Sequence, residues 1–271
     1  MDAAALRAFY ECDPAQAAAD PRFSEAHAAL LELLESGQLR AAEPDGAGGW
    51  RVNAWVKQAI LTGFRAFPLE AQPGGPWPYF DKGAYPARQL RLEDGVRLVP
   101  GGSSARRGAH LARGVVVMPP AYINVGAFID EGTMVDSHAL VGSCAQIGKR
   151  VHLSAAAQVG GVLEPAGARP VIVEDEAFVG GLVGLFEGIR VGPRAVLASG
   201  VVITGSTVIH DLVHGRTWQR EVPPGAVVVP GSRPAGGDYA AGHGLQLSVP
   251  VIVKYRDART DAATALEEAL R

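Results

Sequence analysis

The chain has few cysteines, little net charge and no long apolar run, and each of these scarcities excludes a class of protein. Two cysteines among 271 residues, Cys12 and Cys144, are too few for a disulfide framework and fit a reducing compartment. A net charge of −3 at pH 7 gives no basic surplus for nucleic acid. No apolar run reaches the roughly 18 to 20 residues of a membrane helix, and residues 1–7 lack the pattern of a secretory signal. We therefore expect a cytoplasmic protein with no nucleic-acid partner and no membrane contact.

The middle of the chain, in contrast, repeats with a period of six residues. The aliphatic residues at this spacing form two runs: Val117, Ile123, Ile129, Val135, Val141, Ile147, Leu153 and Val159, then Val173, Val179, Leu185, Val191, Leu197, Ile203 and Ile209. Neither a 3.6-residue helix nor a hairpin meander has this period, whereas a hexapeptide β-helix does. Because one repeat cannot bury its apolar face alone, many repeats must stack. We predict a mainly β protein built on a left-handed parallel β-helix of hexapeptide repeats.

The repeat divides the chain into three predicted parts. Residues 1–95 form an N-terminal helical domain and an aromatic connector, residues 96–232 the β-helix, and residues 233–271 a C-terminal extension. Within the first part, we expect Ser24 and Asn53 to cap helices. We expect residues 68–86, rich in proline, glycine and aromatics such as Trp77, Tyr79, Phe80 and Tyr85, to be ordered because aromatic rings favour burial. The extension should contain a strand over residues 249–255 and a helix over residues 261–270.

One interruption in the repeat predicts a loop. Two regular repeats after Val159 would end at residue 171, but the period resumes at Val173, so we expect two extra residues to bulge outward there. Loops that project from a solenoid usually lie at a binding face. The flat sides of such a coil are commonly buried in a homotrimer, which is an expectation from the fold alone.

Common catalytic and metal-binding motifs are missing. Residues 142–149 resemble a phosphate-binding loop, but five residues separate the two glycines and Arg150 stands where that loop needs Ser or Thr. The chain has no zinc-type cysteine pair and no His-Glu-x-x-His motif. His210 and His214 would suit a metal only on a helix, and we expect them in a solvated loop. We therefore predict no metal site.

One acidic residue and one histidine in the coil suggest acid–base chemistry. Asp136 directly follows the aliphatic Val135, and His138 is two residues further on. Since alternate residues of a strand share a face, we expect both side chains to project from one outer face. A carboxylate beside an imidazole is the ordinary arrangement of a general base. Two solvated surface residues would have the same spacing, so the geometry leaves both interpretations open.

Several blocks of sequence carry a family resemblance. Residues 121–136 contain Asp-Glu-Gly-Thr-Met-Val-Asp, and residues 141–149 read Val-Gly-Ser-Cys-Ala-Gln-Ile-Gly-Lys. Shorter blocks are Tyr-Phe-Asp-Lys at 79–82, Arg-Leu-Val-Pro at 97–100, His-Leu-Ser at 152–154, Gly-Gly-Val-Leu-Glu-Pro at 160–165 and Val-Ile-Val-Lys at 251–254. Together they closely resemble the tetrahydrodipicolinate N-succinyltransferase family over nearly the whole chain.

The resemblance implies a trimeric acyltransferase that moves succinyl from succinyl-CoA to an amine nitrogen in the diaminopimelate and lysine pathway. It implies a small amino-acid acceptor and no permanently bound cofactor. With the spacing of Asp136 and His138, it gives three groups of candidate residues. The catalytic group is Asp136 and His138; the substrate-binding group is Arg97, Asp136, Ser154, Gly160 and Gly161; the acyl-CoA-binding group is Gly180, Gly184, Ser199, Gly200, Lys254 and Arg259.

The chain departs from the family pattern at pocket positions. Gly184 stands where the family has an acidic residue regarded as catalytic, and Leu182-Val183 replaces a polar pair. Ser137-His138 replaces Thr-Trp, and Ala155-Ala156 replaces Gly-Gly. The scaffold motifs are intact.

Three hypotheses follow from these departures. The chain is a standard succinyltransferase in which His138 or Asp136 handles the proton, or a diverged paralogue, or a catalytically weak scaffold. A paralogue would acylate a related amino acid from acetyl-CoA or succinyl-CoA in secondary metabolism, such as toxin biosynthesis. The retained Arg97 and Asp136 argue against a scaffold, and the rewritten stretch over residues 181–184 argues against the standard enzyme.

Overall fold

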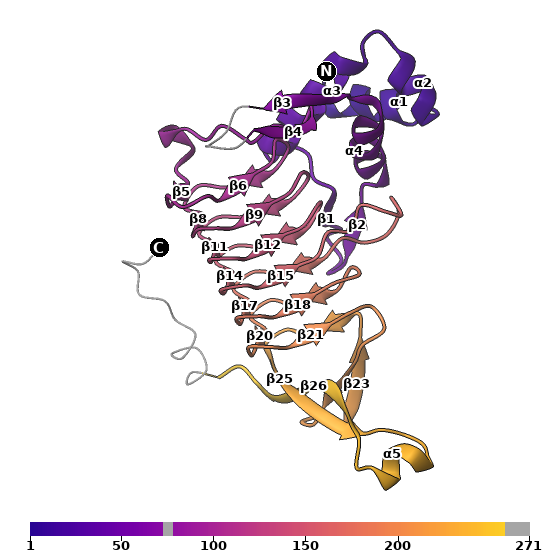
Figure 1. The fold of residues 1–271 in the computed structure, drawn as a ribbon, viewed down its shortest axis with the longest axis vertical. Helices are drawn as coiled ribbons and strands as arrows, with labels where there is room; N and C mark the ends of the chain where they lie inside the picture. Colours follow the sequence, from indigo (N-terminus) through magenta and orange to yellow (C-terminus); the bar gives the residue numbers. More distant parts are fainter. Residues whose placement is uncertain (73–77, 258–271) are drawn as a thin grey trace.

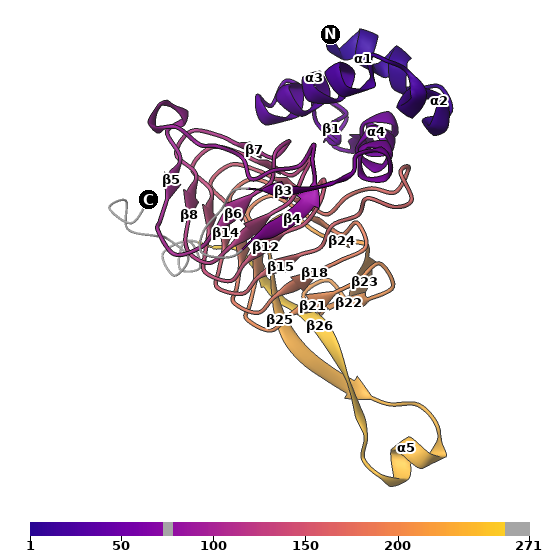
Figure 2. The ribbon, with the colours of Figure 1, turned by 45° about the horizontal axis from the view of Figure 1, so that its top comes forward.

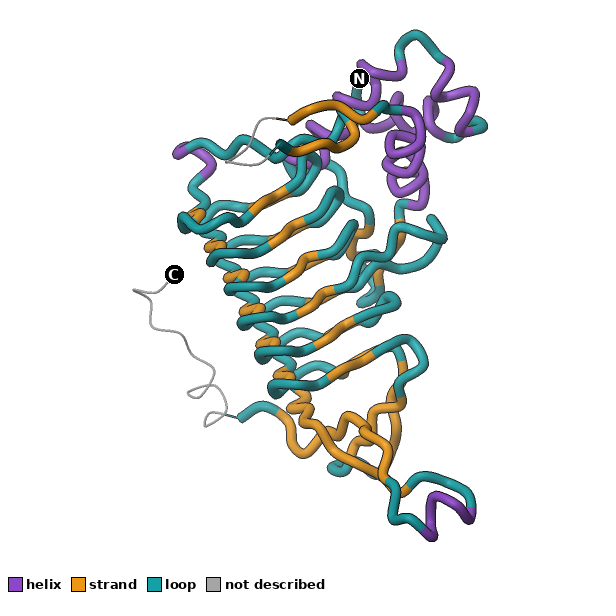
Figure 3. The backbone as a smooth tube through the Cα atoms, viewed as in Figure 1, coloured by secondary structure: helices purple, strands orange, loops and turns teal. Residues whose placement is uncertain are grey.

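A parallel β-helix forms the body of the molecule in the computed structural model, which describes residues 1–72 and 78–257. Short strands wind around three faces and stack coil upon coil (Figure 1, Figure 3). Face A contains β7 (His110–Leu111), β10 (Phe128–Ile129), β13 (Gln146–Ile147), β16 (Ile172–Val173), β19 (Arg190–Val191) and β24 (Glu221–Val222). Face B contains β5 (Arg97–Leu98), β8 (Val116–Val117), β11 (Met134–Val135), β14 (His152–Leu153), β17 (Phe178–Val179) and β20 (Val196–Leu197). Face C contains β6 (Ser104–Ala105), β9 (Tyr122–Ile123), β12 (Leu140–Val141), β15 (Gln158–Val159), β18 (Gly184–Leu185) and β21 (Val202–Ile203).

The six-residue period corresponds to one face of this coil. Ile129 pairs with Ile147 in parallel register, so three successive repeats, one for each face, complete a full coil. All fifteen aliphatic residues of the repeat are at most 1% exposed, and they stack along the axis as one core. The predicted left-handed β-helix is confirmed. Arg97 already belongs to the coil, because β5 pairs with β8 as part of face B.

The loop after β15 is longer than predicted. In a coil of three regular repeats, Ile147 would pair with residue 165, but it pairs with Val173. Eight residues are therefore extra, not two, because a single repeat separates face C from face A and the whole insertion lies at that corner. Lys57 fastens this loop from the N-terminal part: its buried ammonium donates to the carbonyl oxygens of Ala168 at 2.6 Å and Pro165 at 3.2 Å.

The N-terminal part packs against the first coils with a core of its own (Figure 2). It contains α1 (Ala3–Tyr10), α2 (Pro14–Ala19), α3 (Phe23–Glu35), α4 (Ala54–Ala66) and the hairpin of β1 (Ala42–Pro44) and β2 (Trp50–Val52). The predicted cap at Ser24 is wrong, because α3 starts one residue earlier, after Arg22. Asn53 does precede α4, but its side-chain amide donates to Arg40 O at 2.8 Å and makes no capping bond. None of the helices in the described ranges is long and apolar enough to cross a membrane.

The described part of the aromatic connector, residues 68–72 and 78–86, is only partly buried. It contains the hairpin of β3 (Leu69–Gln72) and β4 (Tyr79–Lys82), followed by a 3₁₀ turn, η1 (Leu92–Asp94). Tyr85 is 1% exposed and donates a hydrogen bond to Ile60 O at 2.8 Å, as its aromatic character predicts. Tyr79 and Phe80 are 49% and 68% exposed, against the prediction, and they lie in a sheet of two strands within the described residues. Trp77 lies outside the described residues.

Longer strands close the far end of the coil. These are β22 (Val208–Asp211), β23 (Arg216–Gln219), β25 (Ala226–Pro234) and β26 (Gln246–Tyr255), with α5 (Asp238–Gly242) at the tip of the β25–β26 hairpin (Figure 1). The predicted strand over residues 249–255 is confirmed and begins at Gln246. The predicted helix over residues 261–270 lies outside the described residues. His210 belongs to β22, so the prediction of a solvated loop is wrong for it, while His214 lies in the turn after that strand.

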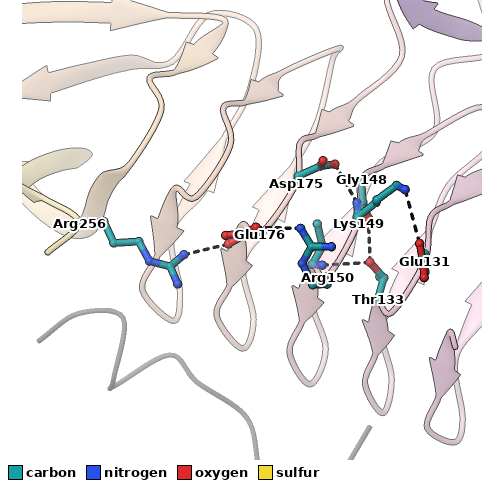
Figure 4. A network of polar contacts seen from close by, with 9 residues as sticks. Glu131, Thr133, Gly148, Lys149, Arg150, Asp175, Glu176 and Arg256 are labelled. Atoms are coloured by element: carbon teal, nitrogen blue, oxygen red, sulfur yellow. Dashed lines mark hydrogen bonds and ion pairs between the residues drawn. The ribbon is translucent and has the colours of Figure 1, made fainter. Parts of the chain in front are cut away.

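Charged residues alternate along the corner between faces A and B (Figure 4). Lys149 Nζ lies 3.4 Å from Glu131 Oε2, and Arg150 donates to Glu176 at 2.8 Å. Arg256 follows β26 and donates to the Glu176 carbonyl at 2.9 Å, so the end of the described chain is attached to this corner. Because these side chains are largely exposed, each pair contributes little to stability.

A buried carboxylate joins the closing strands. Asp211, 2% exposed, accepts hydrogen bonds at one oxygen from His214 Nδ1 at 2.9 Å and Tyr255 OH at 2.8 Å. Its other oxygen accepts the backbone N–H groups of Val213 and His214 at 3.1 and 3.2 Å. Burial acts to raise the pKa of the Asp211 carboxyl, but the hydrogen bonds from His214 and Tyr255 outweigh it and hold the pKa well below its usual range.

Asp211→Asn should therefore lower the free energy of unfolding at pH 7 by about 1.5 to 3 kcal/mol, the range for hydrogen bonds to a charged group. Because folding depresses this pKa, the stabilisation is complete above the ordinary aspartate pKa of about 3.9 and disappears as the pH falls below it. Urea unfolding at pH 7 and at lower pH should show the gap between variant and parent closing in acid. Asp238→Asn, at an exposed position on the neighbouring hairpin, is the control and should cost less than about 0.5 kcal/mol. A gap that stays constant with pH would contradict the assignment.

Candidate functional site

The corner between faces B and C brings several of the predicted site residues together. Each coil passes this corner directly after its face B strand, and backbone hydrogen bonds join one coil to the next. Ala156 N donates to Ser137 O at 2.8 Å, Leu182 N to Ala155 O at 3.1 Å, and Gly200 N to Gly181 O at 3.0 Å. The predicted site residues stacked here are Asp136, His138, Ser154, Gly180, Ser199 and Gly200.

In four successive coils the chain turns at this corner through a residue with positive φ. The angle is 62° at His138, 59° at Ala156, 61° at Leu182 and 80° at Gly200. Strand alternation ends at such a residue, so the expectation that Asp136 and His138 share one outer face does not apply. His138 is exposed, and none of the contacts seen among the described residues joins its imidazole to Asp136.

The imidazole beside Asp136 belongs to His152 instead. His152 lies in β14, where it pairs with Met134, and its Nε2 lies 3.7 Å from Asp136 Oδ2. The two side chains are 12% and 29% exposed. The sequence contains a signal for this neighbour, because a coil of three repeats places residue 152 next to residue 134, two positions before Asp136. The six-residue period alone does not reveal it.

Arg97 lies on the same face as the strand that leads to Asp136. It pairs with Val116, which pairs in turn with Met134, so two coil spacings separate Arg97 from that strand. At roughly 4.8 Å per spacing, this is about 10 Å along the axis. Arg97 is exposed. One small molecule with a carboxylate at one end and an amine at the other can span this separation.

Gly160 and Gly161 lie at a different corner, between faces C and A. A Cβ on Gly161 would lie 2.6 Å from Ser143 N, and a Cβ on Gly160 would lie 2.7 Å from Phe186 Cδ1. Close coil stacking therefore already requires glycine at these positions. Their predicted contact with substrate remains a prediction.

Gly184 is covered by the same aromatic ring. It is the first residue of β18 on face C and is buried, and a Cβ there would lie 2.6 Å from Phe186 Cε2. The ring of Phe186 thus extends over Gly160 and Gly184 in adjacent coils. Where the family pattern has an acidic side chain, this chain has no titratable group and an aromatic ring fills the space.

The remaining acyl-CoA candidates divide between the corner and the closing strands. Gly180 is fixed by packing, since a Cβ there would lie 2.6 Å from Leu197 O, while Ser199 is exposed. Gly200 borders a cavity of about 230 Å³ lined by Gly200, Val201, Val202, Thr207, Pro230, Ser248, Val249 and Pro250. Lys254 lies in β26, with Nζ 3.5 Å from Asp257 Oδ1. Arg259 lies outside the described residues.

Two family models match the chain. Residues 6–66 match the model described as tetrahydrodipicolinate N-succinyltransferase N-terminal, and residues 170–205 match the hexapeptide repeat of succinyl-transferase. The first covers the helical part and the second covers coils that include β17 and β18.

Full-length relatives are similar over nearly the whole chain. The 2,3,4,5-tetrahydropyridine-2,6-dicarboxylate N-succinyltransferase of Aromatoleum aromaticum is 49% identical over 260 residues, which cover 94% of this chain and 92% of the relative. The protein of that name from Afipia carboxidovorans is 42% identical over 271 residues, covering 97% and 95%. A solved structure from Campylobacter jejuni, provisionally named as a 2,3,4,5-tetrahydropyridine-2-carboxylate N-succinyltransferase, has a TM-score of 0.58 at 17% identity. That alignment covers 84% of this chain and 62% of the other, and it supports the fold alone.

The packing of Phe186 over Gly184 gives a prediction for stability. Gly184→Ala should cost about 1 to 2 kcal/mol, because the ring must leave the sheet surface. In a Phe186→Ala background the same change should cost little, so the two substitutions should be strongly non-additive in a double-mutant cycle measured by urea unfolding. Gly205→Ala, also on a buried glycine but next to Glu187, is the control and should be additive with Phe186→Ala. Additive costs for the Gly184–Phe186 pair would show that the ring does not occupy this space.

Proposed function

The chain belongs to the tetrahydrodipicolinate N-succinyltransferase family, and we propose on this premise that it transfers succinyl from succinyl-CoA to the amine of the opened, hydrated form of tetrahydrodipicolinate. The observation that supports this most is the identity of 42 to 49% to proteins of that name over nearly the whole chain. The alternative of a paralogue with another acceptor is not favoured, since the relatives at this level of identity carry the name of the standard enzyme. The protein acts as an acyltransferase in lysine and diaminopimelate synthesis in the cytoplasm.

Arg97 and Asp136 have distinct roles in this proposal. The guanidinium of Arg97 binds a carboxylate of the acceptor through paired hydrogen bonds. Asp136, about two coil spacings further along, receives the proton of the acceptor amine, because only a neutral nitrogen attacks a thioester. The exposure of Arg97 on face B and the partial exposure of Asp136 at the corner after that face, two coil spacings apart, support this division. Ser154, Gly160 and Gly161 remain candidate contacts to the acceptor.

The acyl donor lies along the corner in this proposal. Ser199 and Gly200 stand two coils beyond Ser154, and the cavity of about 230 Å³ next to Gly200 reaches the β25–β26 hairpin. A chain as long as the pantetheine arm needs such an extended path. Lys254 on β26 is the candidate for a phosphate contact, while Gly180 lets the path run close to the backbone. Arg259 is a further candidate near the phosphates.

A homotrimer completes the site in this proposal. Large apolar side chains are exposed on face C and the corner beside it: Tyr122 at 38%, Val202 at 53% and Leu182 at 69%. The N-terminal helices and the closing hairpin leave this surface uncovered (Figure 1). A neighbouring subunit that covers it would turn the open corner into a cleft.

The proposed function predicts the choice of acyl donor. The purified protein should release CoA thiol from succinyl-CoA in the presence of a tetrahydrodipicolinate acceptor, with kcat/KM at least about tenfold above that for acetyl-CoA, since the pocket is built for one acyl group. Thiol release followed with a chromogenic disulfide measures this, with lysine as the control acceptor. Preference for acetyl-CoA, or for lysine, would contradict the proposal.

The proposed base gives a second prediction. Asp136→Asn should lower kcat by about 10²-fold or more, while KM for succinyl-CoA changes less than about threefold, because the carboxylate acts on the amine and not on the donor. His138→Ala, measured in parallel, tests the candidate next to it. A large loss in kcat there would assign proton transfer to His138, and an unchanged kcat would remove it from the catalytic group. Full turnover in Asp136→Asn would exclude Asp136 as the base.

A further inference from the structure

His152 and Asp136 face each other at the proposed catalytic corner. The three-repeat coil places β14 beside β11, so the imidazole of one coil meets the carboxylate of the coil before. The distance of 3.7 Å from Nε2 to Oδ2 is short enough for electrostatic coupling and too long for a hydrogen bond. The 12% exposure of His152 means that this contact is largely shielded from water, where electrostatic coupling is stronger.

Both side chains are held in place. Asp136 Oδ1 accepts the backbone N–H of Ser137 at 2.7 Å, which leaves Oδ2 as the oxygen that faces the imidazole. The ring of His152 packs edge-to-face against Phe178, with centroids 5.1 Å apart. Met134 and Phe178, the neighbours of His152 from the strands on either side, carry no charge. Asp136 is the carboxylate that the described residues place beside the imidazole.

A buried hydroxyl stands beside this pair. Ser154 follows His152 by two residues and occupies the same corner position as Asp136, one coil further on. Its Oγ is buried, and within the described ranges it has no hydrogen-bond partner. An unsatisfied buried hydroxyl is costly, so Ser154 Oγ is a group that a molecule bound at this corner could engage by a hydrogen bond.

From this geometry we infer that His152 is a positioning residue for the proposed reaction, one that acts on the acceptor through Asp136. The inference rests on the proposed function. The amine nitrogen attacks the thioester carbonyl carbon, the N–C bond forms, and the C–S bond breaks with the electron pair going to sulfur. Before the attack, the acceptor ammonium gives one proton to the pair of Asp136 and neutral His152, which releases it to water. After the attack, the second proton lost by nitrogen goes to Asp136 Oδ2, and the pair passes one proton to the thiolate. The reaction ends with CoA thiol and the starting charge on the pair.

The arrangement also explains how the chain works without an acid at residue 184. A lone carboxylate is a weak base for an ammonium group, and a neighbouring imidazole improves it by sharing the proton. Gly184 is covered by Phe186, so no side chain from that position reaches the corner. His138 is exposed and has a positive φ itself, so it belongs to the turn. His152, in contrast, is largely buried and lies next to Asp136.

The coupling is tested first without turnover. In protein with labelled histidine rings, NMR titration should show the midpoint of His152 moving to lower pH by about one unit in Asp136→Asn, because removal of the anion disfavours the charged imidazole. His243, exposed on the closing hairpin, is the internal control and should not move. An unchanged midpoint for His152 would overturn the inference whatever the protein acylates.

The second arm measures kinetics. His152→Gln keeps a hydrogen-bond donor but cannot share a proton. It should lower kcat for succinyl transfer about 10- to 100-fold, with KM for succinyl-CoA changing less than about threefold and the acid limb of the pH–kcat profile displaced. The double variant with Asp136→Asn should be no slower than Asp136→Asn alone, since the two residues act as a unit.

The control variant for this arm is His243→Gln, which should match the parent in rate and in pH profile. A His152→Gln profile that superimposes on that of the parent would reduce His152 to a packing role and overturn the inference. If His152→Gln does not fold, as judged by circular dichroism, His152→Asn and the NMR titration decide the question. If the wild-type protein does not transfer succinyl, the proposed function is contradicted. The coupling of His152 to Asp136 is then tested by the NMR titration alone.

Discussion

The stacking of one aliphatic side chain on another from coil to coil is the constraint on which the rest of the structure depends. Ile129, Ile147 and Val173 illustrate it: each pairs in register with the next, and each is fully buried. Burial of such a side chain contributes roughly 1.5 to 3 kcal/mol, and the contribution is realised only when neighbouring coils are present. Register is consequently fixed from one end of the coil to the other. Every outward-facing residue therefore has a fixed neighbour one coil away.

This inherited register builds the candidate site. Asp136 and Ser154 occupy the same corner in successive coils, and His152 meets Asp136 because its strand is paired with Met134. No loop has to fold over to bring these groups together. Residues far apart in sequence, such as Arg97 and Asp136, share one face for the same reason. The closing strands, tied by the buried Asp211, give the far end of the corner a wall against which the cavity next to Gly200 forms.

The sequence predicts the parts of this arrangement that depend on periodicity. The inward aliphatic residues, the stack of strands and the strand at 249–255 follow from spacing or composition, and the structure confirms them. The spacing from Val159 to Val173 underestimates the loop before β16, because it does not say how many faces of the coil lie between the two residues. The residue type of Ser24 favours a cap, yet the start of α3 is set by packing of Phe23. Sequence proximity points to His138 as the neighbour of Asp136, whereas pairing between successive coils brings His152 closer.

The division between inward and corner residues also explains why this chain can differ from its relatives where it does. Val183 is fully buried and must stay aliphatic to serve the core, whereas Leu182 has a φ of 61° and is 69% exposed. A corner residue of that kind contributes little to the core, so its side chain is free to change with the chemistry. Gly184 is intermediate: it faces outward, but Phe186 now occupies its space, and the two positions can change only together. An acidic side chain at residue 184 would therefore have to displace the ring of Phe186. A compensating proton acceptor has to come from a position whose geometry the coil already fixes, and Asp136 with His152 is such a position.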